Sequence, residues 1–257
     1  MNTEVLLTVY GLKSIIPKNA GSHNSIYRGE DITDLFYNGT LTTQIAAGTF
    51  DDIFVGDYII GNVSNTKYLV ADIDYRYNSG DTLTTTHHIL MFPETIMGRE
   101  KMNDTATTTG AYTGSKMRTT TLSTYQTIIQ NDFGSNHILQ HRNRFAKAVN
   151  NGCESSTDFY DSVIDLMNEH MVYGCDVWHN LVPNSNMTVA RIDKKQLSIF
   201  RYRPDLILAK DTNNVKKDWW LRDVSNSTKF ACITDANQTN NLDANNNMGI
   251  RPAFLIY

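Results

Sequence analysis

Residues 219–254 read WWLRDVSNSTKFACITDANQTNNLDANNNMGIRPAF, with two apolar ends and a polar middle. The first end, WWLRD at 219–223, combines bulky rings with a charged pair, and GIRPAFLI at 249–256 is typical of a closing strand. The middle is rich in asparagine and cannot bury enough apolar surface to form a core of its own. We therefore expect ordered strands to hold it at the surface, where binding residues are common. Large residues at its ends should be buried: Trp220, Leu221, Phe230, Ile250 and Phe254.

The composition outside this stretch is that of a globular chain. Of 257 residues, 40% are hydrophobic and 19% are charged, which excludes a disordered or membrane-embedded class. A net charge of −4 argues against a nucleic-acid partner. No apolar run reaches the ~18 residues that span a bilayer, and the N-terminus lacks a basic region and a cleavage site. We expect no membrane insertion and no secretory signal.

The cysteines predict neither disulfides nor zinc. Cys153, Cys175 and Cys232 are far apart and lack metal-ligand spacing. We expect three buried thiols in a reducing cytoplasm.

The chain in order predicts an α+β fold. Residues 1–49 are short apolar pieces broken by glycine and proline, which either pack on the main domain or dock on a partner. Residues 50–257 form the main domain in this interpretation. Alternating patterns predict strands over 54–61, 67–75 and 85–93, joined by tight turns into an antiparallel meander.

Helical spacing follows the meander. A first helix is predicted from Ser115 to Phe133, ending at Gly134, and a second over 157–173, ending at Gly174. A short helix over 193–200 and a strand over 205–208 complete the prediction.

No catalytic motif is present: the sequence has no GxSxG, phosphate-binding P-loop or GxGxxG pattern. His137 and His141 have i, i+4 spacing but lack the intervening glutamate of a zinc site, so no metal ligand is predicted. Asp243–Gly249 resembles the start of a calcium loop, yet Phe254 occupies the twelfth position, where an acid is needed. Calcium stays an alternative to the absence of any cofactor.

The aromatic and charged residues at the ends of the stretch have two interpretations. Trp219–Trp220 either offers a stacking platform or, as we favour, buries one ring in the core. Arg222, Asp223 and Arg251 are expected to tie the two ends together through charge-assisted hydrogen bonds.

Several motifs, taken in order, resemble those of C-type-lectin-like domains in phage and bacterial surface proteins, including retroelement-diversified tropism proteins. They are FDDIFVGDYIIG at 50–61, TGAYTGSKMRTTTL at 109–122, FYDSVIDLMNEHMVYG at 159–174, WWLRD at 219–223 and GIRPAFLI at 249–256. This resemblance over roughly residues 50–257 implies two helices on small antiparallel sheets, with a short N-terminal extension. The acid of the calcium-dependent sugar motif is missing, because the chain has Val182-Pro183-Asn184.

The resemblance also implies a ligand face between WWLRD and GIRPAF. Carried over, its residues are Asn226, Thr228, Lys229, Asp235, Asn237, Asn240, Asn241, Asp243, Asn245 and Asn246.

The implied function is that of a phage virion surface protein, on a tail, fibre or capsid, assembled in the host cytoplasm. It would display this face to a glycan or protein of the host surface. Residues 1–49 would attach it to other virion proteins, in a homo-oligomer. Two alternatives stay open: a purely structural capsid or tail component, and an enzyme of the formylglycine-generating type, whose cysteine pair and metal sites we cannot place.

Overall fold

The computed structural model describes residues 16–180 and 193–257, which form an α+β fold around two five-stranded sheets. The first sheet is antiparallel throughout and has the order β1-β2-β3-β14-β7. Its strands are β1 (Tyr58–Ile60), β2 (Lys67–Ile73), β3 (Ile89–Pro93), β14 (Pro252–Ile256) and β7 (Ile164–Leu166). The predicted meander is therefore confirmed, and GIRPAFLI does supply a closing strand beside it.

The second sheet contains the WWLRD motif and much of the asparagine-rich stretch. Its order is β12-β11-β10-β13-β4, antiparallel except for the β10–β13 pair. The strands are β12 (Thr239–Asp243), β11 (Lys229–Ile233), β10 (Trp219–Val224), β13 (Met248–Ile250) and β4 (Gly98–Glu100). The polar middle expected at the surface is thus largely a hairpin of β11 and β12, and β11 buries Phe230 through Ile233.

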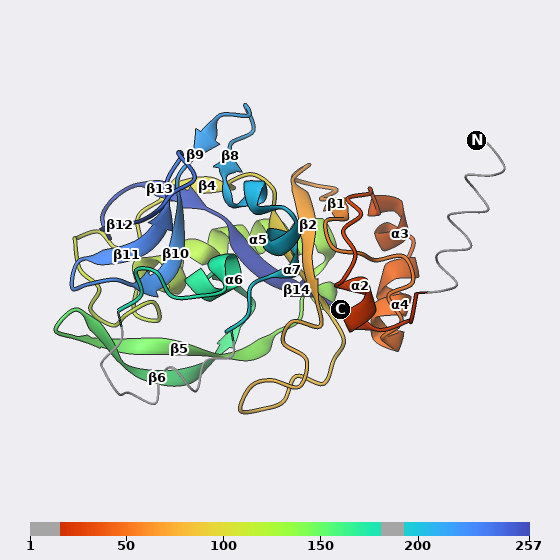
Figure 1. The fold of residues 1–257 in the computed structure, drawn as a ribbon, viewed down its shortest axis with the longest axis horizontal. Coiled ribbons are helices and arrows are strands. Elements are labelled where there is room, and N and C mark those ends of the chain that lie inside the picture. The colour runs from red at the N-terminus through yellow and green to blue at the C-terminus, as the bar shows by residue number, and fades with distance from the viewer. Residues whose placement is uncertain (1–15, 181–192) are drawn as a thin grey trace.

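The first predicted helix is confirmed. A π-helical turn, η1 (Met117–Thr121), leads into α5 (Leu122–Phe133). Gly134 follows with a φ of +83°, a conformation that glycine adopts without strain. Figure 1 shows α5 crossing the middle of the molecule, with the second sheet on one side and the N-terminal helices on the other.

The second predicted helix, over 157–173, is wrong. That region contains β6 (Cys153–Ser162), β7 and only a short helix, α6 (Glu169–Tyr173), which does end at Gly174. β6 pairs with β5 (His141–Asn150) in a two-stranded ribbon that runs along the lower edge of Figure 1. Asn151 and Gly152 both have positive φ, of 48° and 78°, as a two-residue hairpin turn requires.

Two shorter predictions also need correction. Residues 204–207 form a 3₁₀ turn, η3 (Pro204–Ile207), where a strand was predicted, because the proline ring fixes the φ of its first residue. The predicted helix over 193–200 lies later in the chain, as α7 (Ser198–Tyr202). The remaining short elements are η2 (Ser135–His137), β8 (Ala209–Lys210) and β9 (Lys216–Lys217).

The described part of the N-terminal segment packs on the main domain. It forms α2 (Ala20–His23), α3 (Thr33–Tyr37) and α4 (Thr40–Ala47). Phe36, Leu41 and Ile45 belong to the same apolar core as Phe254. Residues 16–49 therefore do pack on the main domain, while residues 1–15 lie outside the described residues.

The core occupies both faces of β10. Trp220 lies in one apolar cluster, and Trp219 and Leu221 lie in another. Both tryptophan rings are fully buried, so the expectation of a single buried ring is wrong. The five residues predicted to be buried are each at most 1% exposed: Trp220, Leu221, Phe230, Ile250 and Phe254.

Candidate functional site

The ten residues predicted for a ligand face lie along the β11–β12 hairpin and the turns at its ends. Their exposure decreases from the turns toward the strands, and none is buried. The exposed members are Asp235, Asn237, Asn245 and Asn246, and the half-buried members are Asn226, Thr228, Lys229, Asn240, Asn241 and Asp243. β12 is the outer strand of its sheet. The hairpin thus brings these residues together at one margin of the sheet.

Several of these side chains hold the hairpin itself. The Oδ1 atom of Asn226 accepts the backbone N–H groups of Thr228 at 2.9 Å and Lys229 at 3.0 Å. The Thr228 hydroxyl donates to Asp243 at 2.8 Å. Asn240 accepts the backbone N–H of Asn241 at 2.8 Å, which protects one outward group of an edge strand. These contacts make Asn226, Thr228, Asn240 and Asp243 supports of the hairpin.

A second group has no such support role. Within residues 16–180 and 193–257, no hydrogen bond or ion pair engages the side chains of Lys229, Asp235, Asn237, Asn241 and Asn245. These five polar side chains are therefore available to a ligand.

The charged pair of the WWLRD motif lies in a buried polar network that the sequence analysis did not find. Arg222 forms an ion pair with Asp193 and donates to the carbonyl of Leu166 at 2.9 Å. Arg76 Nη1 lies 2.7 Å from Asp193 Oδ1, in ion-pair contact without hydrogen-bond alignment. Burial alone would raise the pKa of Asp193, but the two guanidinium groups outweigh it and hold that pKa well below its usual range.

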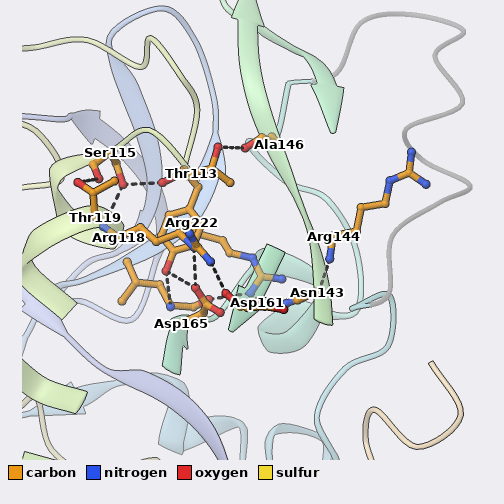
Figure 2. A network of polar contacts seen from close by, with 12 residues as sticks. Thr113, Ser115, Arg118, Thr119, Asn143, Arg144, Ala146, Asp161, Asp165 and Arg222 are labelled. Atoms are coloured by element: carbon orange, nitrogen blue, oxygen red, sulfur yellow. Dashed lines mark hydrogen bonds and ion pairs between the residues drawn. The ribbon is translucent and has the colours of Figure 1, made fainter. Parts of the chain in front are cut away.

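Asp165 extends this network toward α5. Its Oδ1 accepts from the Tyr112 hydroxyl at 3.0 Å and from Arg118 Nε at 3.3 Å. Figure 2 shows Arg118 and Asp165 meeting beside Arg222, between the turn that precedes α5 and the β5 strand. Burial raises the pKa of Asp165, and the neighbouring arginines oppose that rise.

A neighbouring cluster surrounds His179. Its Nε2 lies 2.7 Å from Glu154, and its Nδ1 lies 3.0 Å from Asp176 and 3.6 Å from Asp223. Burial alone would lower the pKa of His179, but these carboxylates outweigh it and raise the pKa to about 10. Glu169, fully buried, accepts the backbone N–H groups of residues 177–179. The imidazolium is thus held by fixed negative charges.

The cavity between the two clusters is small. It measures about 30 Å³ and is bordered by Tyr112, Glu154, Asp193, Arg222 and Asp223. One water needs about 10–15 Å³ of such a cavity, so the cavity holds a water or two and has no space for a substrate. We infer that these buried charges position β10 and the β5–β6 ribbon.

The structure contradicts the expected contacts between the two ends of the stretch and the expected burial of all three cysteines. Arg222, Asp223 and Arg251 do not tie the two ends of the stretch to each other: Arg251 donates to the carbonyls of Pro93, Glu94 and Leu206 instead. Of the cysteines, Cys232 is buried, but Cys153 is half-buried and Cys175 is exposed.

Residues of the proposed calcium loop have other roles in the structure. Met248 and Gly249 belong to β13, and Asp243 is engaged by Thr228. In the described ranges, no group of three or more histidines, cysteines and acids is arranged to hold a metal ion. Val182-Pro183-Asn184 lies outside the described residues.

The comparisons with known proteins give a family but no activity. No curated protein and no solved structure matches the chain. Among the described residues, no helix has the length and apolar character needed to cross a membrane. The model of a domain of unknown function, DUF6273, matches residues 80–257, which include α5, the β5–β6 ribbon and all of the second sheet. The chain therefore belongs to the DUF6273 family.

Proposed function

We propose that the protein is a non-catalytic binding module, carried on a phage virion, that presents the β11–β12 hairpin to a glycan or protein of the host surface. The observation that supports this proposal is a contrast within the second sheet. Its strand β10 is buried, whereas polar side chains on the β11–β12 hairpin at its edge are free. Trp219 and Trp220 are both 0% exposed, whereas the side chains of Asn241 and Asn245 have no hydrogen-bond partner among the described residues. A rigid base lowers the ordering cost of binding.

The hairpin is also preorganised by its own polar contacts. Asn226, Thr228 and Asp243 close its open end through hydrogen bonds of 2.8 to 3.0 Å. The free side chains therefore project from a fixed backbone, a common arrangement for recognition residues carried by a scaffold. Attachment to other virion proteins through residues 1–49, and a homo-oligomer, belong to the same proposal.

The test compares two double variants of the protein in assembled particles. Asn241→Ala/Asn245→Ala removes two free side chains at positions without left-handed backbone. Asn237 has a φ of 60°, where alanine would add strain, and is left unchanged. The matched control is Asn62→Ala/Asn131→Ala, which alters two exposed asparagines outside the hairpin.

We expect the hairpin variant to reduce adsorption of the particles to host cells by about tenfold or more, as loss of central interface contacts does. Its urea midpoint should equal that of the control. Normal adsorption by both variants would contradict the proposal. If particles that lack the protein altogether also adsorb normally, a purely structural role in capsid or tail assembly replaces it.

A further inference from the structure

A groove of about 370 Å³ lies beside the β8–β9 hairpin, which projects from the top of the molecule in Figure 1, on the side opposite the β5–β6 ribbon. One wall is residues 94–95, directly after β3, and the other is residues 203–208, in and around η3. Residues 210–214 of the β8–β9 hairpin close it at one side. We call it the β8–β9 groove. Its volume falls in the range of about 300–1,000 Å³ that small-ligand sites occupy.

Both walls of the β8–β9 groove are fixed by Arg251. This guanidinium donates through Nε to the Pro93 carbonyl at 2.9 Å and through Nη2 to the Glu94 carbonyl at 3.0 Å. Through Nη1 it donates to the Leu206 carbonyl, on the opposite wall, at 2.7 Å. One side chain behind the groove thus joins the backbone of its two walls.

Further contacts hold the same segments. Trp219 Nε1 donates to the carbonyl of Ile207 at 3.0 Å. The backbone N–H of Ile96 donates to the carbonyl of Lys210 at 2.8 Å. Residues of the WWLRD and GIRPAF motifs therefore organise the groove, although neither motif lines it.

Burial of the charged Arg251 side chain costs free energy. It is fully buried, and within the described chain no carboxylate lies within ion-pair distance of it. Its compensation consists of three carbonyls and of the rings of Phe92 and Trp219, at 4.5 and 5.3 Å. A buried ionic group is often less stabilising than an apolar side chain of similar volume. The contacts of Arg251 therefore shape the groove through three carbonyls in place of an ion pair.

The acids that line the groove are already neutralised. Glu94 pairs with Lys67 at 3.3 Å, and Asp211 pairs with Lys217 at 3.2 Å. Asp205 pairs with Arg203 at 2.6 Å. The remaining lone pairs of these carboxylates can accept hydrogen bonds from neutral donors. A strongly charged ligand would instead have to displace either the acid or the base of an ion pair.

The other lining groups fit a ring that carries hydroxyls. The hydroxyls of Thr95 and Thr212 have no hydrogen-bond partner in the described part of the chain, and they offer donors and acceptors. Lys210, whose charge acts on Asp205, adds further donors. Leu206 and Leu208 supply an apolar patch. A sugar has hydroxyls around its rim and apolar C–H groups on its face. We propose that the β8–β9 groove binds one neutral saccharide unit, at a site separate from the β11–β12 hairpin.

The experiment is a titration of the full-length, isotope-labelled protein followed by NMR. The probes are the methyl glycosides of glucose, galactose and mannose, and N-acetylglucosamine, each to about 50 mM, because single-sugar sites are often only millimolar. Glucuronate is the charged comparator. At least one neutral sugar should shift the signals of residues 94–95 and 210–214 in a saturable way.

Matched variants identify the site. Thr95→Ala/Thr212→Ala removes two free hydroxyls and should weaken binding by about tenfold. Thr85→Ala/Thr120→Ala, which changes two exposed threonines outside the groove, should leave the affinity unchanged. Asn241→Ala/Asn245→Ala should also leave it unchanged, which separates this site from the proposed display face.

Three results would overturn the proposal. They are the absence of shifts in the groove with all four neutral sugars, equal binding by the Thr95→Ala/Thr212→Ala variant, and tighter binding of glucuronate than of any neutral sugar.

Discussion

Replacing Asp193 by asparagine tests whether the buried ion pairs hold the scaffold together. Asp193 is 1% exposed and lies between Arg76 and Arg222, which are 4% and 6% exposed. It also accepts from Asn143 at 3.1 Å. Asparagine keeps the shape of the side chain but removes its charge. Two guanidinium groups would then share a buried site without the carboxylate that lies between them.

The expected cost follows from that geometry. Breaking a buried ion pair by removal of one partner costs about 3–5 kcal/mol, since the remaining charge stays desolvated. Asp165 lies near the same arginines and keeps part of the compensation, so we expect about 4 kcal/mol. With a urea m value of about 3 kcal/mol/M for a chain of this size, the midpoint should fall by about 1.3 M.

The pH dependence adds a second readout. The arginines hold the pKa of Asp193 below its unfolded value, so the carboxylate contributes stability above about pH 4, which is lost as the pH falls through the folded pKa. The difference between wild type and Asp193→Asn should therefore be full at pH 7 and shrink below pH 4.

The control is Asp158→Asn, which neutralises an exposed carboxylate that pairs with Lys147 at 2.8 Å. Its midpoint should match that of the wild type. A midpoint for Asp193→Asn within about 0.3 M of the wild type would refute the argument, because it would leave less than about 1 kcal/mol for the whole buried network.

Two further predictions use the same urea assay. His179 has a pKa raised to about 10 by Glu154 and its other acidic neighbours, against the effect of burial; its stabilisation of about 3–5 kcal/mol should be complete below about pH 6.5 and disappear as the pH rises toward 10. The difference between wild type and His179→Gln should shrink over that interval, and a constant difference would be inconsistent with the charged cluster. Gly152→Ala should cost about 1–2 kcal/mol, because Gly152 has a φ of +78° and a Cβ there would lie 3.1 Å from a backbone nitrogen. Gly21→Ala should cost less, because Gly21 is helical and its added Cβ would meet only the Asn19 side chain, at 3.3 Å.

Local sequence signals predicted the features that neighbouring residues decide. Gly134 and Gly174 do end helices, as expected from their freedom at positive φ. The meander of β1, β2 and β3 followed from short alternating segments between turn residues. These features depend on interactions within a few residues.

The wrong helix shows the limit of periodicity. Met167 and Met171 have helical spacing, and both are buried, but only 169–173 is helical. Asn151-Gly152 is a strong hairpin signal in the sequence and would have predicted the β5–β6 ribbon. A short apolar run does not distinguish a strand from a helix, so the turn residues before it carry more information.

The polar network lay beyond the sequence because its partners are distant along the chain. Arg222 and Asp193 are 29 residues apart. The position of Arg222 and Asp223 between two apolar tryptophans and Val224 indicates that their charges are buried. It does not identify the residues with which they pair.

The sequence by itself determined where apolar side chains end and polar ones begin, and hence that the ends of residues 219–254 are buried while its asparagines reach solvent. Only the tertiary structure decided which of those asparagines are free, since Asn226 and Asn240 are engaged by backbone groups. It alone also formed the β8–β9 groove, where Arg251 joins Glu94, 157 residues away, to Leu206, 45 residues away. The physical reason is that burial tendencies belong to single residues, whereas hydrogen bonds and cavities require segments that only the folded chain brings together.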